Sequence, residues 1–159
     1  SAMTAFLGFA VNEGEYKVMG LAAYGTPRFK DEMSRIARVH DDGTFELDLA
    51  CFRFHLDDET SFSSALCERL GNARDPSSPI DLESAEGQRF ADIAASVQAV
   101  TEDAVLALAR RAHEVTRRGR LCLVLGNLSA PLTTCLKSHL GVFSHPSRAV
   151  VGTKFLQNV

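Results

Sequence analysis

A long helical repeat of apolar residues in the second half of the chain most constrains how this sequence can fold. Within residues 88–116, apolar and small residues recur at steps of three and four, the spacing of one face of an α-helix. A helix of that length spans about 40 Å, so other elements must cover its apolar face. The members of this face are Phe90, Ile93, Ala94, Val97, Thr101, Ala104, Val105, Leu108, Ala112 and Val115.

A second segment, residues 14–25, gathers glycines, tyrosines and charges in a short stretch. It reads Gly-Glu-Tyr-Lys-Val-Met-Gly-Leu-Ala-Ala-Tyr-Gly. The spacing predicts a short helical turn closed by Gly25 in the left-handed conformation, which glycine adopts at little steric cost. Glu15 and Lys17 lie at the entry to this turn, so the segment suits close approach to a polar ligand. The alternative is an ordinary helix cap, because short glycine patterns are weak indications of a site.

Three apolar runs predict strands. Residues 6–11 predict a buried strand in which Gly8 marks a bulge or close packing. Residues 44–49 follow an Asp-Gly hairpin signal and alternate in polarity, which predicts a half-buried strand. Residues 121–125 are apolar and follow the long helix, which predicts a central, parallel strand. The apolar face of the second strand comprises Phe45, Leu47 and Leu49.

Two further helices are expected before the long one. Thr26 suits the N-cap and Pro27 the first position of a helix that ends near Arg38. Residues 61–70 predict a helix capped by Gly71, with a loop after it. The buried stripes of these helices are expected to be Phe29, Met33 and Ile36 in the first and Phe62, Leu66 and Leu70 in the second.

These elements together predict a mixed α/β fold with a ligand-binding edge. In such sheets, ligands lie beyond the carboxyl ends of the strands, which here means Gly126 and Asn127. Asn127 is thereby placed to contact a nucleotide, and a plain turn after the strand is the alternative.

Composition restricts the class of protein. Hydrophobic residues make up 45% of the chain and the net charge is −3, which predicts a globular domain and excludes a basic field for nucleic acid. No apolar run approaches the roughly 20 residues of a membrane span. The four cysteines lack C-x-x-C spacing and no signal-peptide pattern is present, so we predict reduced thiols and a cytoplasmic location.

A group of metal-ligating residue types occurs in residues 51–58. Cys51, His55, Asp57 and Asp58 are types that bind zinc or iron, but their spacing matches no closed site. We interpret them as surface carboxylates beside a loop histidine and expect no metal in this part of the chain.

Residues 14–25 resemble the signature Gly-Glu-Tyr-Lys-Val-Met-Gly-Leu-Ala-Pro-Tyr-Gly of the O-carbamoyltransferases of nodulation-factor and antibiotic biosynthesis. Ala23 stands where that family usually has proline. The resemblance continues at residues 42–45, 52–55 and 91–102, and it fades at 121–123.

The resemblance implies a partial ribonuclease-H-like lobe of the actin, Hsp70 and sugar-kinase superfamily, with one long helix packed on a small sheet. Such a domain transfers a carbamoyl group from carbamoyl-adenylate to a hydroxyl, with a bound metal assisting, while a separate domain makes the adenylate. The site residues implied are Glu15, Lys17 and Gly20, with ATP, ADP or carbamoyl-adenylate as ligand. Proteins of tRNA threonylcarbamoylation have a similar domain and are the nearest alternative.

One charged residue of the long helix stands out because of this resemblance. Asp92 lies in a segment that resembles the family, whereas the other charges on its predicted solvated face do not stand out in this way. Those other residues are Glu102, Asp103, Arg110 and Arg111.

The sequence departs from the family in three places. The family's His-His-x-x-His-Ala metal motif has no counterpart here, and the paired glycines expected after Leu123 are not both present. Nothing in residues 131–159 resembles the family, and all 20 acidic residues precede Gly126. We therefore predict a carbamoyltransferase-like fragment over residues 1–125 and a divergent tail over residues 126–159 that packs on the same domain.

The function predicted from these observations is that of a truncated carbamoyltransferase-like protein, inactive alone, which supplies the nucleotide side of the domain. The alternatives are a non-catalytic homo-oligomeric scaffold and one subunit of a split enzyme completed by another chain. Half of an α/β lobe exposes a sheet edge and a helix face, so a homodimer or a complementing chain is the expected partner. No nucleic-acid or membrane partner is expected.

Overall fold

The computed structural model describes residues 1–56 and 60–115. These residues divide into two compact units, and each is described by itself. The first comprises Ser1–Val39 and Phe45–Thr101. The second comprises His40–Thr44 and Glu102–Val159, of which the structure describes residues 40–44 and 102–115. The expected strand at 121–125 and the tail at 126–159 lie outside the described residues.

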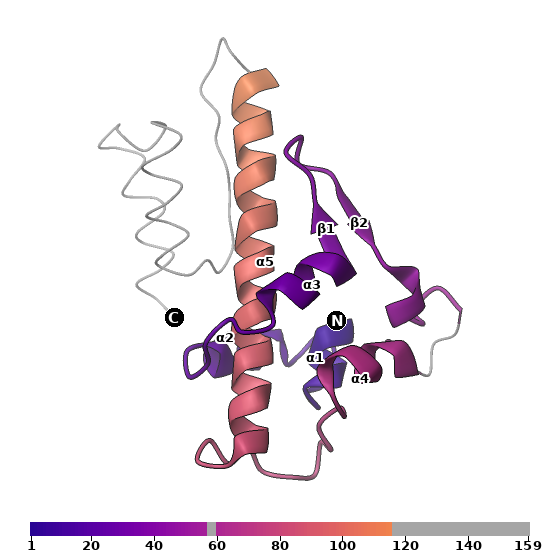
Figure 1. Cartoon of the computed structure of the whole chain (residues 1–159), viewed down its shortest axis with the longest axis vertical. Coiled ribbons are helices and arrows are strands. Elements are labelled where there is room, and N and C mark those ends of the chain that lie inside the picture. The colour runs from indigo at the N-terminus through magenta and orange to yellow at the C-terminus, as the bar shows by residue number, and fades with distance from the viewer. Residues whose placement is uncertain (57–59, 116–159) are drawn as a thin grey trace. The chain divides into compact units, whose positions relative to one another are not determined.

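The first unit is built mainly from helices. Its short helices are α1 (Ala2–Phe6), α2 (Glu15–Ala22), α3 (Lys30–Ile36) and α4 (Ser64–Leu70), and the first part of α5 (Ala85–Val115) also belongs to it. The four short helices lie around this part of α5 (Figure 1). They bury a common apolar core whose fully buried members include Phe6, Leu7, Leu66 and Ile93.

The long helix is confirmed, and it begins three residues before the predicted start, at Ala85. The hydroxyl of Ser84 accepts a hydrogen bond from the Gly87 N–H at 3.0 Å and so satisfies one free donor of the first turn. Between residues 90 and 96 the helix is buried on nearly all sides, because every residue except Ala95 is classed as buried. The first part of α5 is therefore a central element rather than a one-sided amphipathic helix.

Residues 6–11 do not form the predicted strand. α1 ends at Phe6, and a turn follows in which Gly8 has a φ of 70° and Asn12 a φ of 68°. The guanidinium of Arg74 donates to the carbonyls of Leu7 at 2.7 Å and Gly8 at 2.8 Å. These carbonyls have partners without a sheet, so the apolar run can be buried as a turn. The close packing predicted at Gly8 is confirmed, since an added Cβ would lie 2.9 Å from Arg74 Nε.

The Asp-Gly turn and a strand after it are confirmed as part of a small antiparallel hairpin, whose first strand takes Ala37 and Arg38, residues predicted to end a helix. β1 (Ala37–Val39) pairs with β2 (Phe45–Leu47), with Ala37 opposite Leu47 and Val39 opposite Phe45. In the connecting turn Gly43 has a φ of 84°, a conformation that favours glycine. The fold is thus mixed α/β, with one long helix and a two-stranded sheet in the described residues.

The predicted apolar face of the second strand is only partly buried. Leu47 packs against the core, whereas Phe45 is 62% exposed and Leu49 is 52% exposed. The alternation ends at Asp48, whose side chain accepts from the Ala50 N–H and so starts a 3-10 helix, η1 (Leu49–Cys51). Leu49 therefore leaves the strand geometry that would have turned it inward.

Of the two short helices that flank the hairpin in sequence, α4 ends where the sequence predicts, whereas α3 begins later than predicted. α4 ends at Gly71 with a φ of 86°, as predicted, and Arg89 donates to the last carbonyl, that of Leu70, at 2.7 Å. α3 begins at Lys30 rather than at Thr26, because the Thr26 and Phe29 N–H groups bind side chains of α5. The buried stripe of α3 is confirmed, with Met33 and Ile36 in the core and Phe29 packed against it.

The second unit, as far as it is described, joins the hairpin tip to the second part of α5. A Cβ on Gly43 would lie 2.9 Å from the Leu108 Cα, so the tip lies against the helix backbone. The side chain of Leu108 is 56% exposed, which differs from its predicted burial on the apolar face. Among the described residues, no helix has both the length and the apolar character needed to cross a membrane.

Gly25 does not adopt the predicted left-handed conformation. The last carbonyls of α2 are instead taken by the N–H groups of the next turn, with Tyr24 bonding Leu21 at 3.0 Å and Gly25 bonding Ala22 at 3.2 Å. Gly25 is required for another reason: a Cβ there would overlap the carbonyl group of Ala91 in α5. Glycine is therefore required at position 25 by close packing against the backbone of α5, and not by its φ angle.

We expect alanine at Gly25 and at Gly20 to change stability in opposite directions. At Gly25 the added methyl group overlaps the backbone of α5, which costs about 1–3 kcal/mol. At Gly20 the methyl group enters open space on a helix, where alanine is favoured over glycine by roughly 1 kcal/mol. Urea unfolding followed by circular dichroism measures both variants. Equal destabilisation by the two substitutions would contradict this account of the segment.

Candidate functional site

A row of three polar side chains on α5 holds the loop that follows α2. Gln88, Asp92 and Ser96 are spaced four residues apart, and each bonds a backbone group of residues 24–29. Gln88 Nε2 donates to the Tyr24 carbonyl at 3.1 Å. The Thr26 N–H donates to Asp92 Oδ1 at 2.8 Å, and the Phe29 N–H donates to Ser96 Oγ at 3.0 Å. We call these three residues the polar row.

Asp92 is the centre of this row. Its residue is only 3% exposed, and its Oδ1 also accepts from Gln88 Nε2 at 3.0 Å. The Nε atom of Arg28 lies 3.4 Å from Asp92 Oδ2. The prediction that Asp92 belongs to a solvated face is therefore wrong, because its carboxylate is buried and has partners. The missed signal was the spacing of Gln88, Asp92 and Ser96, three polar residues on one line of the helix.

The carboxylate of Glu15 is used inside the fold. Glu15 Oε1 accepts from the Asn12 N–H at 3.0 Å and from the Thr4 hydroxyl at 3.4 Å. The hydrogen bond from the Asn12 N–H is the main cause that lowers the pKa of Glu15 below its usual value. Glu15 thus ties α2 to the turn before it and to α1.

Lys17 and Gly20 lie on a different side of α2 from the core. The buried residues of this helix are Val18, Leu21 and Ala22, while Lys17 and Gly20 are exposed. Lys17 Nζ lies 5.9 Å from the centre of the Tyr16 ring, and no heavy atom lies within 4 Å of a Cβ built on Gly20. Both residues are therefore accessible. Gly126 and Asn127 lie outside the described residues.

Aromatic side chains flank this exposed side of α2. Tyr16 is 64% exposed and Tyr24 is 65% exposed, and both are four residues from Gly20. A glycine between two exposed rings leaves the helix backbone open to contact. We call the exposed surface made of Tyr16, Lys17 and Gly20 of α2, together with Tyr24 just after the helix, the open face.

The residues of metal-ligating type do not gather in the part of the chain that the structure describes. Cys51 is fully buried, and burial is the main cause that raises the pKa of its thiol. His55 is exposed beside the Phe54 ring, and Asp57 and Asp58 lie outside the described residues. Among the described residues, no three His, Cys, Asp or Glu side chains are placed to hold a metal ion. The metal implied by the resemblance has no ligand set among these residues.

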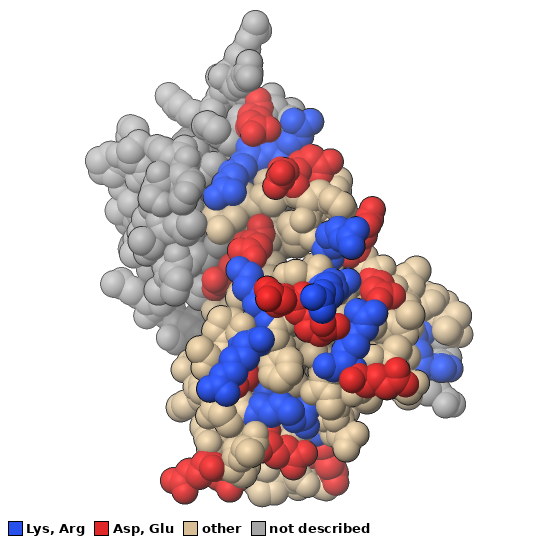
Figure 2. Space-filling view, viewed as in Figure 1, with Lys and Arg blue, Asp and Glu red and all other residues tan. Residues whose placement is uncertain are grey.

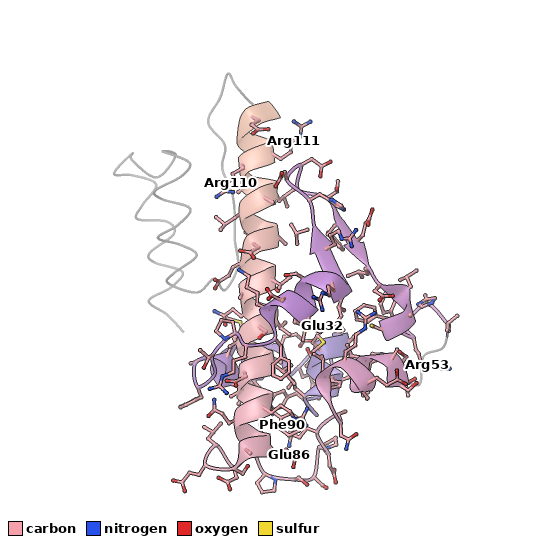
Figure 3. All side chains as sticks on the ribbon, viewed as in Figure 1. Glu32, Arg53, Glu86, Phe90, Arg110 and Arg111 are labelled. Carbon is pink, nitrogen blue, oxygen red and sulfur yellow. The ribbon has the colours of Figure 1, made fainter. Side chains whose placement is uncertain are left out.

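Other charged side chains stabilise the fold. The Arg89 guanidinium stacks 4.4 Å from the centre of the Phe90 ring, near the start of α5 where Glu86 and Phe90 are labelled (Figure 3). Arg69 bridges Glu32 of α3 at 3.6 Å and Asp48 at 2.7 Å. On the face shown in Figure 2, basic and acidic residues are interspersed over the described residues. That face offers no continuous basic field of the kind that binds nucleic acid.

Comparison with known proteins agrees with the sequence resemblance. Residues 1–130 match the family model described as the carbamoyltransferase N-terminus. The chain is 40% identical over 128 residues to a Synechocystis protein described as uncharacterized protein sll1178. That alignment covers 79% of this chain and 20% of the relative, so the chain spans about one fifth of the length of the curated relative it matches. The chain belongs to the carbamoyltransferase N-terminal family, and the matched range ends before residues 131–159.

We expect Asp92→Ala to release the loop from α5. The Thr26 N–H loses its acceptor, and the loss of a part-buried hydrogen bond to a charged group costs roughly 1.5–3 kcal/mol. Amide hydrogen exchange measured by NMR should accelerate at Thr26, and Ser96→Ala should have the same effect at Phe29. Asp103→Ala, on an exposed position of the same helix, is the control and should change neither amide. Unaltered exchange at Thr26 in the Asp92 variant would show that the loop is held by other contacts.

Proposed function

We propose that this chain supplies the nucleotide side of a domain that transfers a carbamoyl group from carbamoyl-adenylate to a hydroxyl. The observation that carries the proposal is the junction at Asp92. It joins α5, which contains the family-like residues 91–102, to Thr26, which directly follows the family-like residues 14–25. Membership of the carbamoyltransferase N-terminal family supports the same class of reaction.

The fold proposed for the larger domain is the ribonuclease-H-like lobe of actin, Hsp70 and sugar kinases. The long central helix and the small antiparallel hairpin are compatible with a part of such a lobe. Gly126 and Asn127, which lie outside the described residues, belong to the proposed site on the sequence pattern of residues 121–127.

The ligand of this site is ATP, ADP or carbamoyl-adenylate, bound at the open face of α2. The ammonium group of Lys17 provides a positive charge for a phosphate, and Gly20 allows close approach of the ligand to the backbone. Glu15 has a positioning role in this site, because its carboxylate is bonded to Asn12 and Thr4. The expected affinity is weak, since a single helix face forms one wall of a pocket.

We propose that this chain alone does not catalyse the transfer of a carbamoyl group. Acyl transfer needs a base for the acceptor hydroxyl and a group that stabilises the developing oxyanion. In the residues that the structure describes, the open face offers tyrosines, a lysine and a glycine, and its nearest carboxylate, Glu15, is engaged. The remaining groups are proposed to come from a complementing chain.

A non-catalytic, homo-oligomeric scaffold is the second candidate, and one observation favours it. Large apolar side chains in the segment from β2 onward remain exposed by half or more, and a second copy of the chain would bury them. These side chains are Phe45, Leu49, Phe54 and Leu56.

We expect the chain to bind ATP and ADP with a dissociation constant on the order of 1 mM. Isothermal titration calorimetry should show this binding, and Lys17→Ala should weaken it because the phosphate loses its cation. Arg35→Ala removes an exposed cation from α3 and is the control. An unchanged titration for Lys17→Ala would remove Lys17 from the site, and no heat with either nucleotide in the unaltered chain would refute the nucleotide site itself.

We expect self-association, measured by light scattering over a series of protein concentrations. Phe45→Ser should lower the apparent mass, because Phe45 is 62% exposed and its replacement removes apolar surface without opening the core. Tyr16→Ser, on the open face of α2, is the matched control. A monomer mass at every concentration would count against the scaffold.

A further inference from the structure

We propose that Arg28 binds a phosphoryl group, and this inference rests on the proposed nucleotide site. Arg28 lies in the loop 24–29, directly after the open face of α2. The loop is an ordered platform, because the polar row bonds it at Tyr24, Thr26 and Phe29. A residue carried by such a loop is held in place before a ligand arrives.

The orientation of the Arg28 side chain supports this role. Its side chain is 70% exposed, while that of Asp92 is 4% exposed. The contact between them uses Nε of the guanidinium, at 3.4 Å from Asp92 Oδ2. Within the residues that the structure describes, this is the interaction found for the guanidinium, so its two terminal nitrogens remain available. The buried carboxylate beside Nε restrains that side of the guanidinium group, as an outer carboxylate orients a ligating side chain.

A second arginine of similar exposure shows the contrast. Arg35 is 72% exposed and also contacts an acid, but it uses a terminal nitrogen, Nη1, at 2.9 Å from Glu32 Oε2. That contact occupies the end of the guanidinium fork, whereas the Arg28 contact leaves the end free. The paired terminal N–H₂ groups of arginine match two oxygens of one phosphoryl group, which gives a bidentate contact.

The chemistry shared by the candidate ligands is a phosphoryl group with two free oxygens. Such a group can belong to a nucleotide or to a small phosphate compound. Tyr24 is 65% exposed at the start of the same loop, which favours a nucleotide because a ring adds a stacking surface for a base. The alternative is that Arg28 only neutralises Asp92 and contacts no ligand.

Titrations of the full chain with ATP, inorganic pyrophosphate and adenosine test the proposal. For Arg28→Gln we expect affinity for ATP and pyrophosphate to fall about tenfold, because a charge-assisted bidentate contact is lost. Adenosine, which has no phosphoryl group, should show no change. Arg35→Gln is the matched control and should bind all three ligands as the unaltered chain does. The melting temperature of both variants is measured to show that they fold.

The outcomes separate this proposal from the proposed function. Unaltered ATP and pyrophosphate affinity in Arg28→Gln overturns the role of Arg28 and leaves the nucleotide site intact. Pyrophosphate binding that depends on Arg28, without ATP binding, supports the phosphoryl contact and overturns the nucleotide site. If the unaltered chain binds neither, both proposals fail. A tenfold loss in Arg35→Gln as well would show that general surface charge, and no specific contact, accounts for the effect.

Discussion

The rest of the first unit depends on the contacts of Asp92 with the loop after α2, which are a hydrogen bond from the Thr26 N–H and an ion pair with Arg28. A carboxylate that is only 3% exposed must be compensated, and it receives the Thr26 N–H, the Gln88 amide and the Arg28 Nε. Removing any of these partners leaves charge or polar atoms without compensation. The position of the loop is therefore tied to the position of α5.

This constraint explains why α5 is surrounded by other elements in the first unit. Its buried stretch needs contacts on every side, and different segments supply them through backbone groups. The loop 24–29 contacts the side that carries the polar row, and Gly25 lies tightly against the Ala91 carbonyl. Arg89 reaches from the same helix to the carbonyls of Leu70 and Asn72, at 2.7 Å and 2.8 Å. The helix thus organises its neighbours by hydrogen bonds to their backbones as well as by apolar packing.

The sequence predicted those elements whose signals are local. The repeat that identifies α5, the glycine that ends α4 and the Asp-Gly turn of the hairpin depend on nearby residues alone, and all three are confirmed. The failures involve partners distant in sequence. Residues 6–11 were expected to need a sheet, but Arg74, more than 60 residues away, bonds their carbonyls. Thr26 was expected to cap a helix, but Asp92 takes its N–H.

The candidate site was predictable to a similar extent. The sequence predicted residues 14–25 as the candidate segment. The structure distinguishes the side chains of this segment that are engaged within the fold from those that are exposed. Glu15 is engaged with Asn12, while Lys17 and Gly20 are exposed. Helical periodicity alone assigns charged residues to the side that faces solvent. It therefore misses the burial of Asp92, which lies in a part of α5 that is covered on nearly all sides.

Two of the three glycines in residues 14–25, Gly20 and Gly25, are glycine for different physical reasons. Gly25 is explained by the fold, since any side chain there would overlap the backbone of α5. Gly20 is not explained in this way: within the described residues its surroundings are open, and a glycine inside a helix costs roughly 1 kcal/mol relative to alanine. A residue that weakens its own helix and packs against nothing in this part of the chain is better explained by what the helix contacts during function. This argument favours the open face of α2, beside the loop that Asp92 holds, as the place where the ligand meets the chain.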